Sequence, residues 1–260
     1  MDWHRSYNRK PGYTKIIGPS PGGLKYIEMG VLCLEPQQTF ASHSGSSEVA
    51  LVVMSGLCAV VAGGREFARV GGRTGFFQGT PAAIYLPPNT EYSVTGLTDV
   101  EIAVGQTTVS EGGEPIYVDP DTIACKVLGE GPMERNVRFV MHDAVPAARL
   151  IVGETVHVSG GWSGWPPHKH DVDDPPRELA SEEVYLIQID PPQGFGFLRI
   201  YDGDKLDVTC TVRDHDVVAI PRGYHPLVGA PGYSVGFLWF MAGATRKWAP
   251  SIDPHHAWTA

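Results

Sequence analysis

The sequence predicts an all-β protein made of two duplicated β-barrels, and three observations lead to that prediction. Short runs of about five to eight residues rich in Val, Ile, Tyr and Phe recur along the chain, whereas helical periodicity is hard to find. The 31 Gly and 22 Pro residues stand singly or in pairs between these runs, as expected for turns. Landmarks of the first half also recur in the second half at a nearly constant distance.

Ten runs have the length and composition of strands. In chain order they cover residues 48–56, 82–88, 91–97, 100–109, 149–158, 182–190, 194–202, 207–214, 216–223 and 233–243. Strands at this density, with turn residues between them, are typical of an all-β sandwich or barrel.

The duplication is indicated by two pairs of landmarks. Glu183 lies 135 positions after Glu48, and His225 lies 134 positions after Glu91, each pair in a similar local sequence. The stretch 111–122 is rich in Gly, Pro and acids and is the natural linker. We therefore expect one barrel in residues 1–128 and a second in residues 129–260.

Composition excludes several classes of protein. The formal net charge is −9 and no dense Lys/Arg cluster is present, which argues against a nucleic-acid partner. The first ten residues show no secretory signal, and the most apolar stretch, 49–64, is too short to span a membrane. The scattered cysteines indicate buried thiols rather than disulfides; they are Cys33, Cys58, Cys125 and Cys210. A cytoplasmic protein is expected, and a homo-oligomer is left open.

The stretch WPPHKHD carries the chemistry. His168 and His170 share one face of a strand, because residues i and i+2 do, and two imidazoles can grip a divalent cation if further ligands join them. Glu183 opens a strand and His225 ends one, so both could converge on the same barrel interior. The first half offers His43, Glu48 and Glu91 but no second His-x-His pair, so no metal is expected there.

These motifs resemble a known family. His-x-His, then Glu, then Pro-x-x-x-His is the two-part motif of the cupin superfamily, and the duplication makes a bicupin, with the double-stranded β-helix (jelly-roll) barrels of that fold. GGWSGWPPHKHD, PPRE, EEVY, PPQGFGF, VVAIPRGYHPLVGAPGY, RNVRFV and DPHHAW are similar to the 5-deoxy-glucuronate isomerase family of myo-inositol catabolism. The match is dense from about residue 128 onward. It implies metal ligation by His168, His170, Glu183 and His225. Glu183 is preferred to Glu182 because strand alternation sends Glu182 outward.

The resemblance also implies a reaction: aldose–ketose isomerisation of 5-deoxy-D-glucuronate to 5-dehydro-2-deoxy-D-gluconate, helped by one divalent ion (Zn, Mn, Fe or Ni). Tyr185 shares the face of Glu183 and is a candidate proton carrier. Arg177 and Arg199 are the catalytic candidates for clamping the substrate carboxylate, with Arg222 as a further choice. Asp171, Asp174 and Glu178 lie in the loop at the barrel mouth.

Two alternatives stay open at this point: a cupin dioxygenase or decarboxylase with the same three-His, one-Glu site, and a non-catalytic sugar-binding cupin. The chain departs from the family pattern at five positions that bear on the sugar: Leu186, Ile187, Gln188, Leu198 and Trp239. We expect Ile187, Leu198 and Trp239 to make the pocket wall more apolar.

Overall fold

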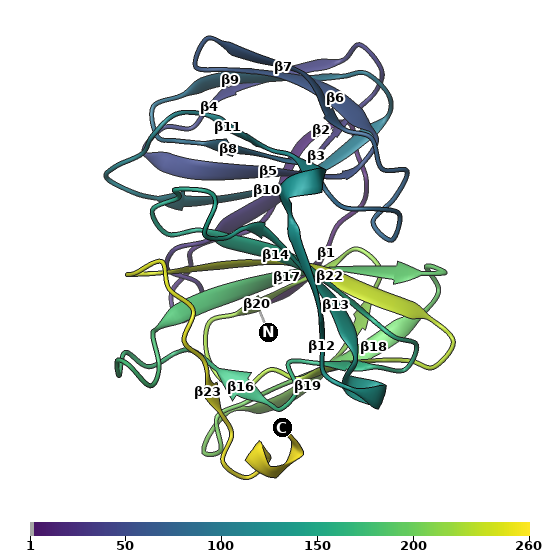
Figure 1. Cartoon of the computed structure of the whole chain (residues 1–260), viewed down its shortest axis with the longest axis vertical. Helices are drawn as coiled ribbons and strands as arrows, with labels where there is room; N and C mark the ends of the chain where they lie inside the picture. The colour runs from purple at the N-terminus through teal and green to yellow at the C-terminus, as the bar shows by residue number, and fades with distance from the viewer. Residues whose placement is uncertain (1–2) are drawn as a thin grey trace.

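The chain folds into two stacked β-barrels, one in each half, as the computed structural model of residues 3–260 shows (Figure 1). The all-β prediction and the duplicated cupin architecture are confirmed. The described residues form strands and three short 3₁₀ turns, η1 (Pro120–Thr122), η2 (Gly131–Met133) and η3 (Ala257–Thr259). None of the helical segments within residues 3–260 is long and apolar enough to cross a membrane.

Eleven strands precede η1: β1 (His4–Ser6), β2 (Gly12–Ile17), β3 (Glu28–Leu34), β4 (Thr39–His43), β5 (Ser47–Ser55), β6 (Leu57–Ala62), β7 (Arg65–Gly71), β8 (Ala83–Leu86), β9 (Glu91–Gly96), β10 (Val100–Thr108) and β11 (Ile116–Val118). The others are β12 (Ala124–Leu128), β13 (Arg135–Met141), β14 (Ile151–His157), β15 (Trp162–Ser163), β16 (His168–Lys169), β17 (Ser181–Asp190), β18 (Phe195–Tyr201), β19 (Asp207–Arg213), β20 (Asp216–Ile220), β21 (Leu227–Gly229), β22 (Ser234–Gly243) and β23 (Ser251–Ile252).

Each half pairs one large sheet with one smaller sheet. In the first half the order is β11-β8-β5-β10-β3-β2, and in the second it is β1-β20-β17-β22-β14-β13-β12. The outer sheets are β4-β9-β6-β7 and β15-β21-β18-β19. Equivalent strands occupy equivalent places in the two halves, which supports the duplication.

The proposed boundary at residue 128 remains a prediction, and strand pairing adds two details to it. β1 leaves the first half and pairs with β20, and β12 already belongs to the second sheet (Figure 1). Asp216 holds β1 in place, because its carboxylate accepts hydrogen bonds from His4 and Ser6. The two halves are therefore joined by more than a linker.

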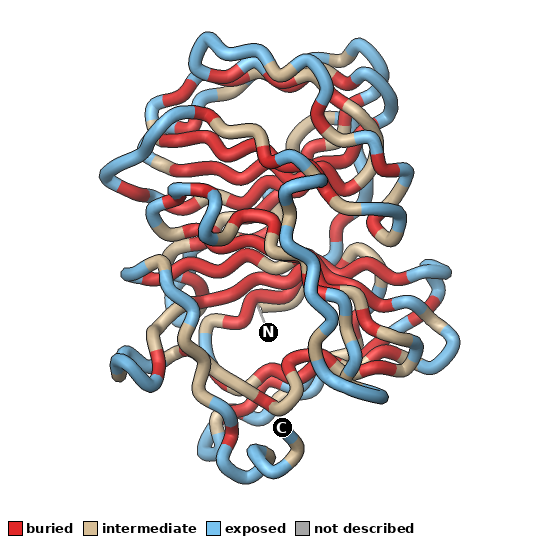
Figure 2. Tube along the Cα trace, in the orientation of Figure 1, coloured by how far each residue is buried: buried red, intermediate tan, exposed pale blue. Residues whose placement is uncertain are grey.

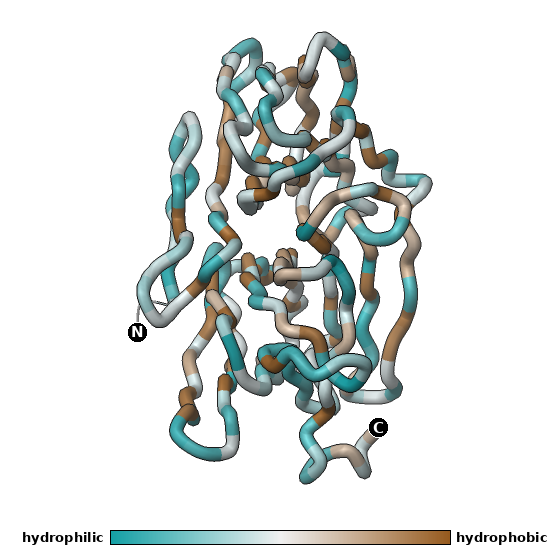
Figure 3. The backbone as a smooth tube through the Cα atoms, turned by 90° about the vertical axis from the view of Figure 1, so that its left-hand side faces the viewer, coloured by the Kyte–Doolittle hydropathy of each residue, from teal (hydrophilic) through white to brown (hydrophobic). Residues whose placement is uncertain are grey.

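The main apolar core lies between the halves. Residues of both large sheets pack there, among them Met29, Val52, Leu186 and Phe240, while each barrel has its own separate interior cluster. Buried chain fills the middle of the molecule and exposed chain its outer loops (Figure 2). Seen from the side, hydrophobic stretches lie on both sides of the contact between the halves (Figure 3).

Two carboxylates tie the halves together in the same way. Glu48 accepts backbone hydrogen bonds from residues 148, 149 and 150 of the second half, at 2.7–2.8 Å. Glu182 accepts them from residues 25, 26 and 27 of the first half, at 2.6–2.7 Å. Both side chains are buried. Because each carboxylate accepts three backbone hydrogen bonds from the other half, the two side chains hold each half against a turn of the other.

This geometry corrects the alignment of the halves by one residue. Glu182 lies 134 positions after Glu48, the same distance that separates His225 from Glu91. The counterpart of Glu183 is therefore Val49, which is fully buried in the core of the first barrel. Pairing Glu48 with Glu183 was wrong, and the first half has an apolar residue at the position of the predicted carboxylate ligand.

We predict that Glu48→Ala and Glu182→Ala each lower the free energy of unfolding by about 2–5 kcal/mol, since each leaves partly or fully buried amide donors without their carboxylate acceptor. Equilibrium denaturation in guanidinium chloride measures the loss. Glu91→Ala is the matched control, because Glu91 is exposed. Equal midpoints for all three variants would contradict the role of the two carboxylates.

Candidate metal centre

Strand β17 presents Glu183 to the barrel interior. Along this strand Tyr185, Ile187 and Ile189 pack in the second barrel's own core, whereas Val184 and Leu186 pack between the halves. Glu183 shares the face of Tyr185, and Glu182 lies on the opposite face. The expectation that Glu182 points out of the barrel holds, although its destination is the buried contact between the halves rather than solvent.

Three imidazoles meet beside Glu183. Ligand atoms of His168, His170 and His225 all lie within 4.8 Å of one another. One carboxylate oxygen of Glu183, Oε2, lies 3.3 Å from Nε2 of His170 and 3.2 Å from Nε2 of His225. The structure thus brings together all four residues that the sequence selected as ligands.

The backbone orients each imidazole. Nδ1–H of His170 donates to the carbonyl of Ser181 at 2.9 Å, and Nδ1–H of His225 donates to the carbonyl of Gly223 at 2.8 Å. His168 makes a longer bond of the same kind to Pro166. Because a carbonyl can only accept, Nδ1 carries the proton and the Nε2 lone pair is left for the centre.

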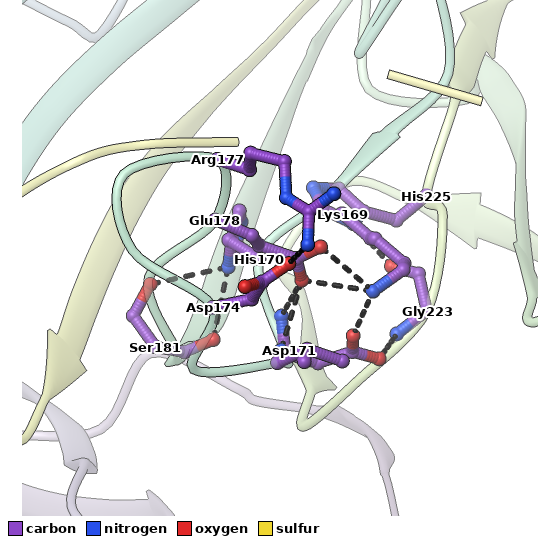
Figure 4. Close-up of polar contacts among 10 residues, drawn as sticks. Lys169, His170, Asp171, Asp174, Arg177, Glu178, Ser181, Gly223 and His225 are labelled. Carbon is purple, nitrogen blue, oxygen red and sulfur yellow. Dashed lines mark hydrogen bonds and ion pairs between the residues drawn. The ribbon is translucent and has the colours of Figure 1, made fainter. Parts of the chain in front are cut away.

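A salt-bridged loop connects the segments that carry His170 and His225 (Figure 4). Lys169 points away from the imidazoles and binds Asp171 at 2.6 Å and Glu178 at 2.8 Å. The other oxygen of Asp171 accepts a hydrogen bond from the amide of Gly223, two residues before His225. Asp171 and Glu178 therefore stabilise the loop, and Asp171 also links the segment that carries His170 to the segment that carries His225.

The electrostatics favour a cation between these groups. Burial alone would raise the pKa of Glu183, but the adjoining imidazoles of His170 and His225 lower it to about 2. Burial and the neighbouring imidazoles lower the pKa of His168 to about 3. One anionic and three nitrogen donors are an established set for a divalent transition metal. The buried Nε2 of His225 makes no well-formed hydrogen bond within the described chain, as expected of a free ligand atom.

A cavity that is open to solvent reaches this cluster, and His168 and Glu183 of the cluster line it. Its walls are mostly apolar, built from Leu128, Val137, Phe139, Ile151, Phe237, Trp239, Met241 and Trp248. The polar side chains that line it are Arg135, His142, Thr155, Ser163, His168, Glu183 and Tyr185. A small polar ligand could therefore reach the cluster.

Tyr185 is the one predicted catalytic residue that lines this cavity. Its ring centroid lies 6.0 Å from that of His225. Burial, and then the negative charge of Glu183, raise the pKa of Tyr185 well above its ordinary value, while Arg135 acts in the opposite sense. The hydroxyl therefore stays protonated at neutral pH.

The two predicted arginines lie elsewhere. Arg177 is 80% exposed and pairs with Asp174. Arg199 pairs with Asp207 through two hydrogen bonds of 2.8 Å on the outer sheet. Neither lines the cavity. Their assignment as substrate clamps remains a prediction that the geometry does not support.

The sequence reasoning did not select Arg135 and His142, which do line the cavity. Arg135 belongs to the RNVRFV motif, so a signal for it was present in the sequence. His142 pairs with Asp143 at 3.0 Å and had no such signal.

The expected apolar pocket wall is found, but only partly at the expected positions. Trp239 lines the cavity, where its indole N–H donates to the hydroxyl of Thr155 at 3.1 Å. Ile187 and Leu198 are fully buried in the barrel core instead. Leu186 packs between the halves, and Gln188 is buried near Tyr7.

Comparison with known proteins places this cluster in a family. A model of the KduI/IolB family matches residues 4–259. The chain belongs to the KduI/IolB family. A 5-deoxy-glucuronate isomerase of Geobacillus kaustophilus is 35% identical over 250 residues, which cover 95% of this chain and 90% of that protein. The 5-deoxy-glucuronate isomerase of Bacillus subtilis strain 168 is 34% identical, with 93% and 90% covered.

Solved structures agree with this membership. The chain is similar to an IolB-like protein of Salmonella typhimurium LT2, with a TM-score of 0.94, 33% identity, and 99% and 98% of the two chains covered. An oxalate decarboxylase of Lactobacillus farciminis gives a TM-score of 0.66 at 12% identity, with 96% and 88% covered. At that identity the likeness shows the bicupin fold alone.

For this KduI/IolB family member we predict that His170→Ala and His225→Ala each abolish stoichiometric metal binding, because each removes one nitrogen donor of the cluster. Metal analysis of purified protein by mass spectrometry tests this. His43→Ala, an exposed histidine of the first half, is the control and should keep its metal. Full occupancy in either site variant would overturn the ligand assignment.

Proposed function

We propose that this protein is a metal-dependent sugar-acid isomerase that converts 5-deoxy-D-glucuronate to 5-dehydro-2-deoxy-D-gluconate, or acts on a closely related uronate, in inositol catabolism. The observation that supports it most is the cluster of His168, His170, His225 and Glu183 beside a mostly apolar cavity. Family membership and the names of the relatives support the reaction. A cytoplasmic location belongs to the same proposal, and a homo-oligomer stays open.

The four side chains would hold one divalent ion, of which Zn, Mn, Fe and Ni are the candidates. When bound, the ion would act as a Lewis acid toward the carbonyl and hydroxyl oxygens of the sugar. One carboxylate and three neutral imidazoles leave the site with a net positive charge, which suits the negative charge that develops during isomerisation.

Tyr185 would carry the proton that is transferred during isomerisation. Isomerisation moves a proton between two neighbouring carbons, so a proton carrier must reach both. The Tyr185 side chain lies on the same strand face as Glu183 and lines the same cavity. The apolar walls would exclude water from this space, which protects the reactive enediol from side reactions.

Turnover without oxygen is the decisive measurement for the reaction class. We expect the metal-loaded protein to convert 5-deoxy-glucuronate under strictly anaerobic conditions, with product followed by NMR. Turnover only in the presence of oxygen would favour a dioxygenase instead. Metal without turnover on any uronate would favour a sugar-binding role and contradict the proposal.

Tyr185→Phe should lower kcat by about 10²–10⁴-fold, the usual contribution of a positioned proton carrier. Metal content and KM should change little, since the ring that packs at 4.2 Å from Phe237 is retained. Steady-state kinetics on metal-loaded protein measure this. An unchanged kcat would remove Tyr185 from the proposed chemistry.

A further inference from the structure

Arg135 has no acidic partner among the described residues. At the start of β13 it lines the metal cavity, and its guanidinium donates to the carbonyls of Met133 at 2.9 Å and Trp165 at 3.4 Å. Within residues 3–260 no carboxylate forms an ion pair with it, in contrast to Arg177 and Arg199. Part of its fork of N–H donors is therefore unused.

The surroundings make an unpaired cation costly. Val137 and Phe139 follow on the same face of β13 and line the cavity with Arg135. Burial lowers the pKa of Arg135, which reflects the loss of water around its charge. An anion in the cavity would restore the lost solvation, and the guanidinium fork matches a carboxylate in two parallel hydrogen bonds.

Arg135 faces the same space as the metal cluster. The ring centroid of Tyr185, which lines the cavity together with Arg135, lies 6.0 Å from that of His225. His168, Glu183, Tyr185 and Arg135 all line one cavity. Apart from the histidines, Arg135 is the only basic side chain among the described residues that line it. An anionic group of a ligand in this cavity can therefore bind either at the metal cluster or at the guanidinium of Arg135.

We propose that Arg135 binds the carboxylate of the sugar acid and sets the preference for acids over neutral sugars, while the opposite end of the sugar lies at the four-residue cluster. This inference rests on the proposed function for the identity of the sugar. The protein's net charge of −9 repels anions at long range, and the guanidinium of Arg135 supplies a local positive charge that offsets this repulsion.

Calorimetric titration with two probes tests the inference without turnover. Metal-loaded and metal-free protein are each titrated with D-glucuronate and with D-glucose, its neutral counterpart. We expect the wild type to prefer glucuronate, and Arg135→Gln to weaken glucuronate binding about 10–100-fold while leaving glucose binding unchanged. Arg135→Lys should retain part of the preference, because it keeps the charge but not the fork.

Kinetics on 5-deoxy-glucuronate provide a second readout. Arg135→Gln should raise KM by a similar factor, with metal content and the circular dichroism spectrum unchanged. Arg69→Gln, an exposed arginine of the first half, is the matched control. Arg177→Gln and Arg199→Gln are the rival variants and should behave like the control.

Several results would overturn the inference: a wild type with no preference for the acid, equal weakening for both sugars in Arg135→Gln, or loss of the preference in a rival variant. Failure of the proposed function looks different. A protein that prefers glucuronate through Arg135 but does not isomerise 5-deoxy-glucuronate would keep the inference and reject the reaction. If the protein isomerises 5-deoxy-glucuronate and Arg135→Gln leaves KM unchanged, the reaction is kept and the inference about Arg135 is rejected.

Discussion

Strand β17 is buried on both faces, and this constraint determines where the site lies. One face packs between the two halves and the other fills the second barrel, so each residue must suit one of two interiors. A register shift of one residue would exchange Glu182 and Glu183. The two adjacent glutamates thus have separate roles: Glu182 joins the halves, and Glu183 meets the imidazoles.

The first barrel supports the site from outside it. Its strand β5 packs back to back with the second half, and Glu48 holds the turn at residues 148–150 that leads into β14. The position equivalent to Glu183 is Val49, which fills the first barrel with apolar volume. The two halves therefore have matching sheets, but among the described residues the His/Glu cluster lies in the second half, and the first half supports it structurally.

Most of the second barrel's polar groups near the mouth are committed to geometry. Carbonyls of residues 181 and 223 orient two imidazoles, and Asp171 joins the loop to the turn before His225. The other polar side chains that line the cavity include Tyr185, His142, Ser163 and Arg135. These groups define the chemistry available to a bound sugar.

The sequence by itself determined the fold class, the duplication and the four clustered residues, because strand periodicity and motif spacing are local properties of the chain. Only the tertiary structure decided which half-to-half register is right, since a one-residue difference changes the face of every side chain but hardly changes a pattern comparison. It also decided which arginine faces the cavity. Arg177 and Arg199 have acidic partners brought close by loop and strand pairing, and Arg135 has none among the described residues. Whether an arginine has an acidic partner depends on contacts between secondary-structure elements, and the spacing of residues along the chain does not predict those contacts.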